Sequence, residues 1–252
     1  MFDFFKKRNN KGKEVVERLR KKVTILERAT WIPEVRGGDG LITASKFAGI
    51  PFIPEGEEWP ECIMCKNPMQ LFVQLNLAEL PALPDGCPNR GFIQLFHCAK
   101  INPECDEDNP TFSPGSKSVV LRYVEQIGEG RKFDIKRKRT EFPPRPIITW
   151  LKETDYPDWD DLIDHGIRLT DAEGEFYHDH FVTIEGEKLL GWPFWIQGAD
   201  YPRCPACQLE MHMLFQIDSC KNIPWSFVDS GMAHIMQCPE HPRNLAFTYS
   251  FY

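Results

Sequence analysis

The stretch "CPACQLEMHMLFQID", residues 204–218, places a Cys-x-x-Cys pair directly in front of an apolar run. A second stretch, "CIMCKNPMQLFVQLN" at residues 62–76, has the same layout 142 residues earlier. At this constant shift the cysteines coincide, as do a methionine and a glutamine: Cys62 with Cys204, Cys65 with Cys207, Met69 with Met211 and Gln74 with Gln216. Chance rarely gives several identities at one offset, so the two stretches predict a repeated unit.

The match continues on both sides of the cysteine pairs. Upstream, "KFAGIPFI" at 46–53 aligns with "KLLGWPFW" at 188–195. Downstream, "GFIQLFHC" at 91–98 aligns with "GMAHIMQC" at 231–238, after a two-residue deletion that a loop absorbs at low cost. We therefore interpret the chain as two copies of one unit.

Both copies predict short strands joined by turns, because their apolar runs are brief and the chain contains 21 prolines. The predicted fold is α+β and β-rich, with two internally repeated antiparallel-sheet units packed with pseudo-two-fold symmetry and few short helices. We expect a basic N-terminal helical segment over 1–35, a first unit over 36–130, a linker with a short helix over 131–180 and a second unit over 181–252. The two units are expected to form one compact domain.

Several elements are expected outside the aligned segments. "KEVVERLRKKVTILERATW" at 13–31 has apolar residues at helical spacing and predicts an amphipathic helix. The segments at 116–127 and 244–252 predict strands, and "YPDWDDLIDHG" at 156–166 predicts a short helix. Two charged stretches predict exposed structure without a helix: a loop over 131–146, and a solvated loop or edge over 171–188.

Charge is unevenly distributed along the chain. The net charge is −7, but residues 1–28 carry ten Lys or Arg against four Asp or Glu, which leaves −13 for the remainder. An acidic body disfavours nucleic acid as a partner and favours a basic protein. No apolar run reaches the roughly 18–20 residues that a membrane span needs, and the N-terminus has the wrong order of charges for a signal peptide. We therefore expect a cytoplasmic protein without a membrane partner.

Seven of the nine cysteines are best explained as metal ligands. Disulfides are unfavourable in a reducing cytoplasm, and a redox Cys-x-x-Cys usually begins a helix, whereas both pairs here precede strands. Buried free thiols would leave the repeated spacing unexplained. Each pair is followed by two further ligands, which completes the closed tetrahedral set of a structural Zn²⁺. The two predicted zinc sites are Cys62, Cys65, Cys98 and Cys105, and Cys204, Cys207, Cys238 and His241; Cys87 and Cys220 are expected to lie outside both.

Four further residues are candidate binding residues: Gln74, Gln216, Asp229 and Trp195. For the two glutamines, two interpretations remain open. Each could satisfy backbone groups within its own unit, or both could line a groove between the units and contact a ligand chain. Trp195 is either a core residue or part of a recognition surface. Asp229 is expected in a chain reversal that Gly231 makes flexible.

Two families share these motifs. "KLLGWPFWIQ", "LFQIDS", "FVDSGMAHI" and the terminal aromatic strand resemble the YwqG-like family, a bacterial domain family of unknown function, and "AGIPFIPEGEEWP" with "MQLFVQLNLAELP" resembles its N-terminal half. This resemblance covers about residues 40–252 and implies a β-rich α+β fold with a duplicated core. The cysteine pattern is similar to the programmed cell death protein 2 family, in which Cys-x-x-Cys also precedes a Gln-containing apolar strand in both halves. Neither family supplies a catalytic residue.

The resemblances and the charge together predict a binding function. Members of the second family are chaperones for a newly made ribosomal protein, and some YwqG-like proteins are candidate immunity proteins of toxin systems. We expect a zinc-stabilised, non-enzymatic protein-binding module, chaperone-like or immunity-type, whose client is basic, such as a ribosomal protein or a toxin domain. The alternative is an enzyme of unknown reaction in a cleft between the units, with Asp229 or the pair His178 and His180 as acid–base groups.

Overall fold

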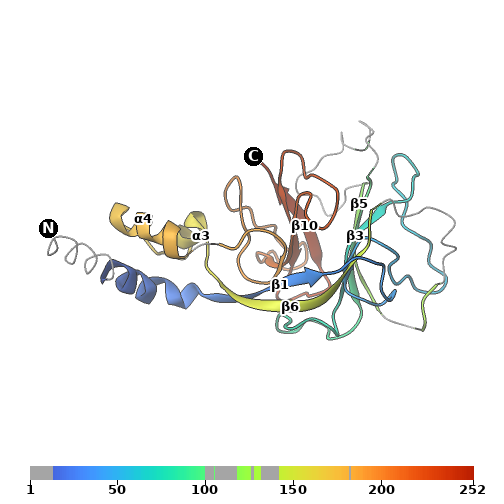
Figure 1. The fold of residues 1–252 in the computed structure, drawn as a ribbon, viewed down its shortest axis with the longest axis horizontal. Helices are drawn as coiled ribbons and strands as arrows, with labels where there is room; N and C mark the ends of the chain where they lie inside the picture. The colour runs from blue at the N-terminus through green and yellow to red at the C-terminus, as the bar shows by residue number, and fades with distance from the viewer. Residues whose placement is uncertain (1–13, 100–104, 106–117, 126–127, 132–141, 182) are drawn as a thin grey trace.

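Ten strands form one antiparallel sheet in the computed structural model, which describes residues 14–99, 105, 118–125, 128–131, 142–181 and 183–252. The strand order is β10-β9-β8-β7-β1-β6-β2-β3-β4-β5 (Figure 1). The strands are β1 (Arg28–Val35), β2 (Lys46–Phe47), β3 (Gln70–Asn76), β4 (Phe92–His97), β5 (Val119–Val124), β6 (Arg145–Asp155), β7 (Lys188–Leu189), β8 (His212–Asp218), β9 (Met232–Gln237) and β10 (Leu245–Ser250). A β-rich fold with few short helices is thus confirmed, and so are the strands expected within 116–127 and 244–252.

The first half of the sheet (β2–β5) and the second half (β7–β10) have the same register. Lys46 lies opposite Gln74 in the first half, and Lys188 lies opposite Gln216 in the second. A bulge interrupts β3 between Leu71 and Val73, and a bulge interrupts β8 between Met213 and Phe215. The β2–β3 and β7–β8 pairings and the two bulges are therefore related by the shift of 142 residues that the sequence shows.

The strands β1 and β6 form the centre of the sheet, and the sequence did not predict them. β1 pairs with β6 and β7, and β6 also pairs with β2, so these two strands join the halves. The helical segment expected over 1–35 is correct for 14–23 but wrong for 28–35, where Pro33 disfavours a helix interior. The linker expected over 131–180 likewise contains the eleven-residue strand β6, with β-branched and aromatic residues at its start. The loop expected over 131–146 lies largely outside the described residues.

Apolar side chains from both halves fill the space between them. Phe47 and Phe215 have ring centroids 5.9 Å apart, and Trp150 of β6 meets Phe215 edge-on at 6.3 Å. The same buried cluster contains Val73, Leu75, Ile93 and Leu95 from the first half and Leu214, Ile217, Ala233 and Ile235 from the second. The inner faces therefore share one hydrophobic core, and burial of this apolar surface holds the halves together.

The outer face of each half carries a smaller core that contains cysteines. In the first half Leu71 and Phe96 pack with Cys62 and Cys98, and in the second half Met213 and Met236 pack with Cys204 and Cys238. The bulges explain this change of face, because an extra residue reverses the alternation of side chains along a strand. Leu71 and Met213 thus face outward, whereas Val73 and Phe215, beyond the bulges, face the central core.

A helical arm, defined as the helix over 14–23 with α3 (Trp159–Asp164) and α4 (Asp171–His180), projects from one end of the sheet (Figure 1). Its own core contains Leu19, Val23, Leu162, Tyr177 and Phe181. The short helix expected within 156–166 is confirmed as α3. None of the helices in the described ranges is long and apolar enough to cross a membrane.

The helix α4 corrects the solvated loop or edge expected over 171–188. Thr170 caps its N-terminus by accepting a hydrogen bond from the Glu173 backbone N–H, while the Glu173 carboxylate accepts one from the Thr170 backbone N–H. This capping box satisfies two backbone donors that a helix start leaves open. Glu173 also accepts hydrogen bonds from Arg18 and Lys22 of the first helix, at 3.0 and 2.8 Å.

A buried lysine is the first residue of the first strand in each half of the sheet. Lys188 Nζ donates to Asp155 Oδ2 at 2.8 Å, and both side chains are fully buried. Asp155 also accepts from the backbone N–H groups of Ile184 and Trp192. In the first half, Lys46 donates to Asp39 at 3.0 Å, but the Asp39 side chain is 38% exposed. Burial lowers the pKa of Lys188 to about 8, with Asp155 opposing the change.

We predict that Asp155→Asn destabilises the protein by about 3–5 kcal/mol, because it leaves the Lys188 charge buried without its partner. The matched change Asp39→Asn should cost less, about 1–2 kcal/mol, because water reaches that site. Urea unfolding at pH 7 measures both. Equal losses in the free energy of unfolding would contradict the conclusion that Lys188 and Asp155 form the ion pair that is shielded from water.

Candidate metal centres

Each Cys-x-x-Cys pair lies on a tight turn with the same hydrogen bonds. The backbone N–H of Lys66 donates to the Cys62 carbonyl at 2.8 Å, and that of Gln208 donates to the Cys204 carbonyl at 2.8 Å. Lys66 and Gln208 both have positive φ, 58° and 63°. Isolated bridges close the turns, between Glu61 and Pro68 and between Arg203 and Glu210. Because the turn reverses the chain within a few residues, both thiols of a pair can face the same point.

The remaining ligands arrive from the neighbouring strand of the sheet. Cys98 directly follows β4 and Cys238 directly follows β9. These strands pair with β3 and β8, which begin shortly after the two turns. Cys105 completes the first set, and His241, three residues after Cys238, completes the second. All eight residues that the sequence predicted as ligands therefore lie in the two clusters.

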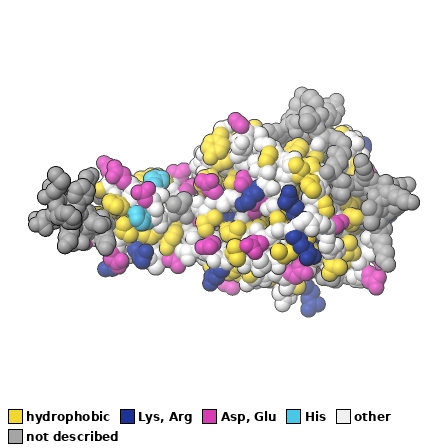
Figure 2. Space-filling view, viewed as in Figure 1, with side chains coloured by type: hydrophobic (Ala, Val, Ile, Leu, Met, Phe, Trp, Pro, Cys, Tyr) yellow, Lys and Arg dark blue, Asp and Glu magenta, His cyan; other side chains and the backbone are white. Residues whose placement is uncertain are grey.

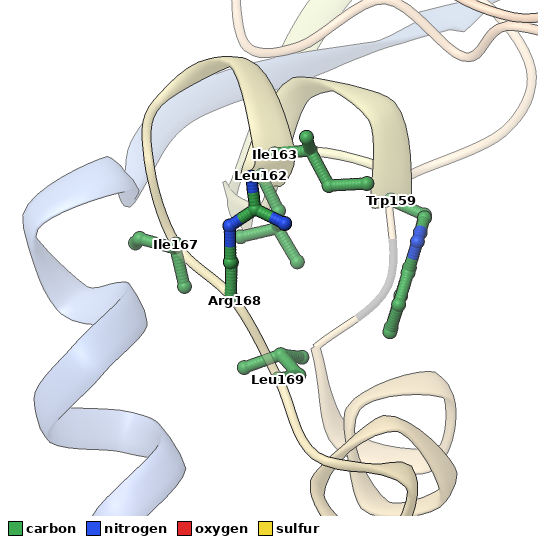
Figure 3. Close-up of a pocket in the computed structure, with 6 residues that line it drawn as sticks. All are labelled: Trp159, Leu162, Ile163, Ile167, Arg168 and Leu169. Carbon is green, nitrogen blue, oxygen red and sulfur yellow. The ribbon is translucent and has the colours of Figure 1, made fainter.

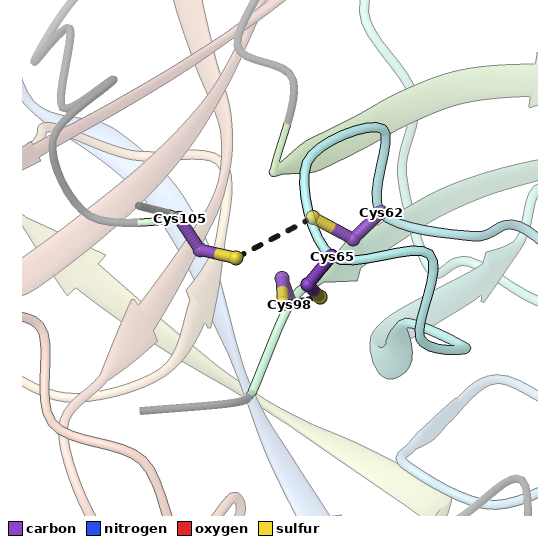
Figure 4. A group of neighbouring side chains, drawn as sticks. All are labelled: Cys62, Cys65, Cys98 and Cys105. Atoms are coloured by element: carbon purple, nitrogen blue, oxygen red, sulfur yellow. Dashed lines mark hydrogen bonds between the residues drawn. The ribbon is translucent and has the colours of Figure 1, made fainter. Parts of the chain in front are cut away.

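The first cluster consists of Cys62, Cys65, Cys98 and Cys105, whose sulfur atoms converge (Figure 4). The Sγ atoms of Cys62 and Cys105 are 3.8 Å apart, and those of Cys65 and Cys98 are 3.6 Å apart. Every pair of ligand atoms in the cluster lies within 4.8 Å. All four residues are free cysteines rather than disulfide partners.

The second cluster consists of Cys204, Cys207, Cys238 and His241. The Sγ atoms of Cys207 and Cys238 are 3.5 Å apart. The Nδ1 atom of His241 lies 3.9 Å from Cys204 Sγ and 3.8 Å from Cys238 Sγ. The Asn244 side-chain amide donates to Cys204 Sγ at 3.3 Å, and the His241 backbone N–H donates to Cys238 Sγ at 3.3 Å.

These separations fit tetrahedral coordination of a metal ion. Metal–sulfur bonds of about 2.3 Å at tetrahedral angles place neighbouring sulfurs about 3.8 Å apart, and a histidine nitrogen about 3.6 Å from a sulfur. The observed separations between 3.5 and 3.9 Å lie close to these values. Two metal ions could therefore be held, one in each half of the sheet, as the sequence predicted.

The thiols of each cluster differ in their acidity. For Cys65, burial opposes ionisation, but hydrogen bonds from Asn67, Cys98 and Cys105 together outweigh it and lower the pKa to about 6. For Cys204, burial likewise opposes ionisation, but hydrogen bonds from the Asn244 amide, from the backbone of Ala206 and Cys207 and from Cys238 together lower the pKa to about 6. Burial and the neighbouring thiols raise the pKa of Cys105, and burial raises that of Cys238. A cation at the centre of each cluster would favour the thiolate form of every cysteine around it.

The sequence pointed to the clusters but not to their hydrogen-bond partners. Asn67 follows the first pair by two residues, yet its counterpart in the second unit is Leu209, so the repeat gave no signal. Asn244 reaches Cys204 only because β10 begins beside β9. Such partners orient metal ligands and are set by tertiary structure. Cys87 and Cys220 lie outside both clusters, as expected.

The candidate binding residues Gln74 and Gln216 lie inside the fold. Gln74 Oε1 accepts from the Phe52 backbone N–H, and its Nε2 donates to the carbonyls of Ile42 and Ala44. Gln216 Oε1 accepts from the Phe194 backbone N–H, and its Nε2 donates to the Gly186 carbonyl at 2.7 Å. Both side chains are fully buried. This geometry matches the structural interpretation left open by the sequence, and it places neither glutamine in a groove.

The other candidates lie apart from one another. Trp195 is only 7% exposed and packs against Tyr201 and His234. Burial of His234 lowers the pKa of its imidazole to about 3. Asp229 is exposed in the turn before β9, where its carbonyl accepts from the Tyr252 backbone N–H. His178 and His180 are exposed on α4 in the helical arm.

Comparison with known proteins places this fold in a family. Residues 45–252 match the family described as Domain of unknown function (DUF1963). The chain belongs to this family. The match begins just before β2 and includes both metal clusters, whereas no curated protein matches the chain. The YwqG-like and programmed cell death protein 2 resemblances stay predictions.

We predict that Cys204→Ser lowers bound metal from about two ions to about one per chain, because one ligand set becomes incomplete. Elemental analysis of the purified protein by mass spectrometry measures this. His241→Cys should retain both ions, and Cys220→Ser, at an exposed cysteine outside the clusters, should change nothing. Two ions in Cys204→Ser would contradict the ligand assignment.

Proposed function

We propose that the protein is a zinc-stabilised, non-enzymatic binding module for a basic protein client. The observation that carries the proposal is the pair of closed four-ligand clusters on the outer faces of one sheet. Three or four thiolates with at most one imidazole suit Zn²⁺ better than Ca²⁺ or Mg²⁺, which prefer oxygen ligands. Such a site would also explain why the long loop that carries each Cys-x-x-Cys motif contains little regular secondary structure.

A structural role for the metal is supported by the number of ligands. Four protein ligands leave no coordination position for a water or substrate, which catalytic zinc sites keep open. In this proposal the two halves are copies of one unit, related by a pseudo-two-fold axis between β1 and β6. The strand order supports this, because it reads equivalently from either edge of the sheet. We place the protein in the cytoplasm, where its thiols would stay reduced.

A basic client is supported by charge. Beyond residue 28 the chain carries −13, so an encounter with a basic protein would be accelerated electrostatically. The two activities that the resemblances imply, chaperoning of a ribosomal protein and immunity to a toxin domain, both involve such a client. The enzymatic alternative gains no support from the structure, since the central core fills the space between the halves and the acid–base candidates are dispersed.

We predict that native purification with a tag after Tyr252 recovers one near-stoichiometric basic protein, and that raised ionic strength weakens its retention. Mass spectrometry identifies the partner, and reconstitution from the two purified proteins checks that the contact is direct. A cluster variant such as Cys62→Ser should lose the partner together with one metal ion. Recovery of the chain alone at both low and high salt would contradict the proposal.

A further inference from the structure

A pocket of about 190 Å³ opens on the helical arm, in a part of the fold that contains neither metal cluster. α3 provides one wall and the loop between α3 and α4 provides the other (Figure 3). The lining residues are Trp159, Leu162, Ile163, Ile167, Arg168 and Leu169. Five of the six are apolar, so the pocket offers a hydrophobic surface with one cationic side chain.

The apolar walls of this pocket are exposed although the arm has its own core. Trp159 is 39% exposed and Ile163 is 44% exposed, whereas Leu162 beneath them is buried. Trp159 is held in place by α4. Its ring stacks on His178, and it lies so close to Gly174 that a Cβ atom at that position would be 3.3 Å from the ring. A wall that is already fixed needs little ordering when a ligand binds, which favours affinity.

The segment that forms the pocket and continues into α4 is acidic. Residues 156–180 contain eight Asp or Glu and one Arg. Three of these acids are used internally: Asp158 caps α3, Asp161 is buried and accepts from Tyr201, and Glu173 pairs with the first helix. The other five are exposed and form no ion pair within the described ranges: Asp160, Asp164, Asp171, Glu175 and Asp179. Figure 2 shows acidic and hydrophobic side chains side by side on the arm.

We propose that this pocket is the docking site for a basic protein segment, which inserts one bulky apolar side chain between Trp159 and Ile163. Lysine or arginine residues on either side of that anchor would face Asp160, Asp164 and Asp171. The Arg168 guanidinium at the pocket would donate to a main-chain carbonyl of the segment. The inference rests on the proposed function for the kind of partner, and it adds the place and the mode of binding.

The chain itself contains a segment of the same chemistry. "FDFFKKR" at 2–8 combines phenylalanines with basic residues, and it precedes the helix over 14–23 whose Val15 and Val16 pack in the same core as Leu162. A short tether gives such a segment a millimolar effective concentration. The test therefore compares the full chain with a chain that lacks residues 1–13.

The experiment is fluorescence polarisation with a labelled nonapeptide that carries Phe and Leu among lysines, at low and high salt. Ile163→Lys should weaken binding at least about tenfold, because it blocks the apolar wall and repels the peptide. Ile148→Lys is the matched control, an exposed isoleucine on β6 (55% exposed), and should bind like the wild type.

The double change Asp160→Asn and Asp164→Asn should weaken binding about threefold to tenfold and reduce its salt dependence. A peptide with serines in place of Phe and Leu should bind at least about tenfold more weakly.

Two outcomes would overturn the inference while the proposed function stands. Equal binding of the co-purified client to wild type and Ile163→Lys would place the client elsewhere on the protein. Clearly tighter peptide binding after removal of residues 1–13 would assign the pocket to the chain's own N-terminus. Absence of any client and of any peptide binding would instead remove the proposed function, and this inference with it. Circular dichroism of each variant verifies that the fold is retained.

Discussion

Four thiol or imidazole groups meet within 4.8 Å on the outer face of each half of the sheet, and the loops around them depend on that contact. Ionised thiols at such distances repel one another, and protonated thiols are weak hydrogen-bond donors. The raised pKa of Cys105 reflects this conflict, because the neighbouring thiols add to the effect of burial. A bound divalent cation would resolve it, because it would favour thiolates at all positions and add its binding free energy to folding.

The pairing of β1 with β6 connects the two halves that contain the clusters. Each of these strands pairs on its other side with a different half, and the shared core seals their inner faces. The helix over 14–23 leads into β1, and α3 follows β6 after three residues, so the arm continues from the same strand pair (Figure 1). The apolar pocket on the arm is therefore carried by the most central part of the sheet.

Much of the fold was accessible from the sequence because the informative residues recur. The sequence match related β3 to β8 at a shift of 142 residues and β4 to β9 at a shift of 140, and these strands lie beside six of the eight cluster residues. β1 and β6 escaped detection because their sequences have no counterpart at that shift and their pairing is distant in the chain. α4 was missed because its charged residues conceal a capping box at Thr170. The pocket could not be predicted at all, since it arises where α3 packs beside a loop.

We expect both clusters to bind zinc through protein ligands alone, and X-ray absorption at the zinc edge of the purified protein would show this. The spectrum should correspond to two zinc ions per chain, with an averaged shell dominated by sulfur at about 2.3 Å, a minor nitrogen contribution at about 2.0–2.1 Å and no oxygen. A shell rich in oxygen, or a protein that is fully folded without any metal, would contradict it.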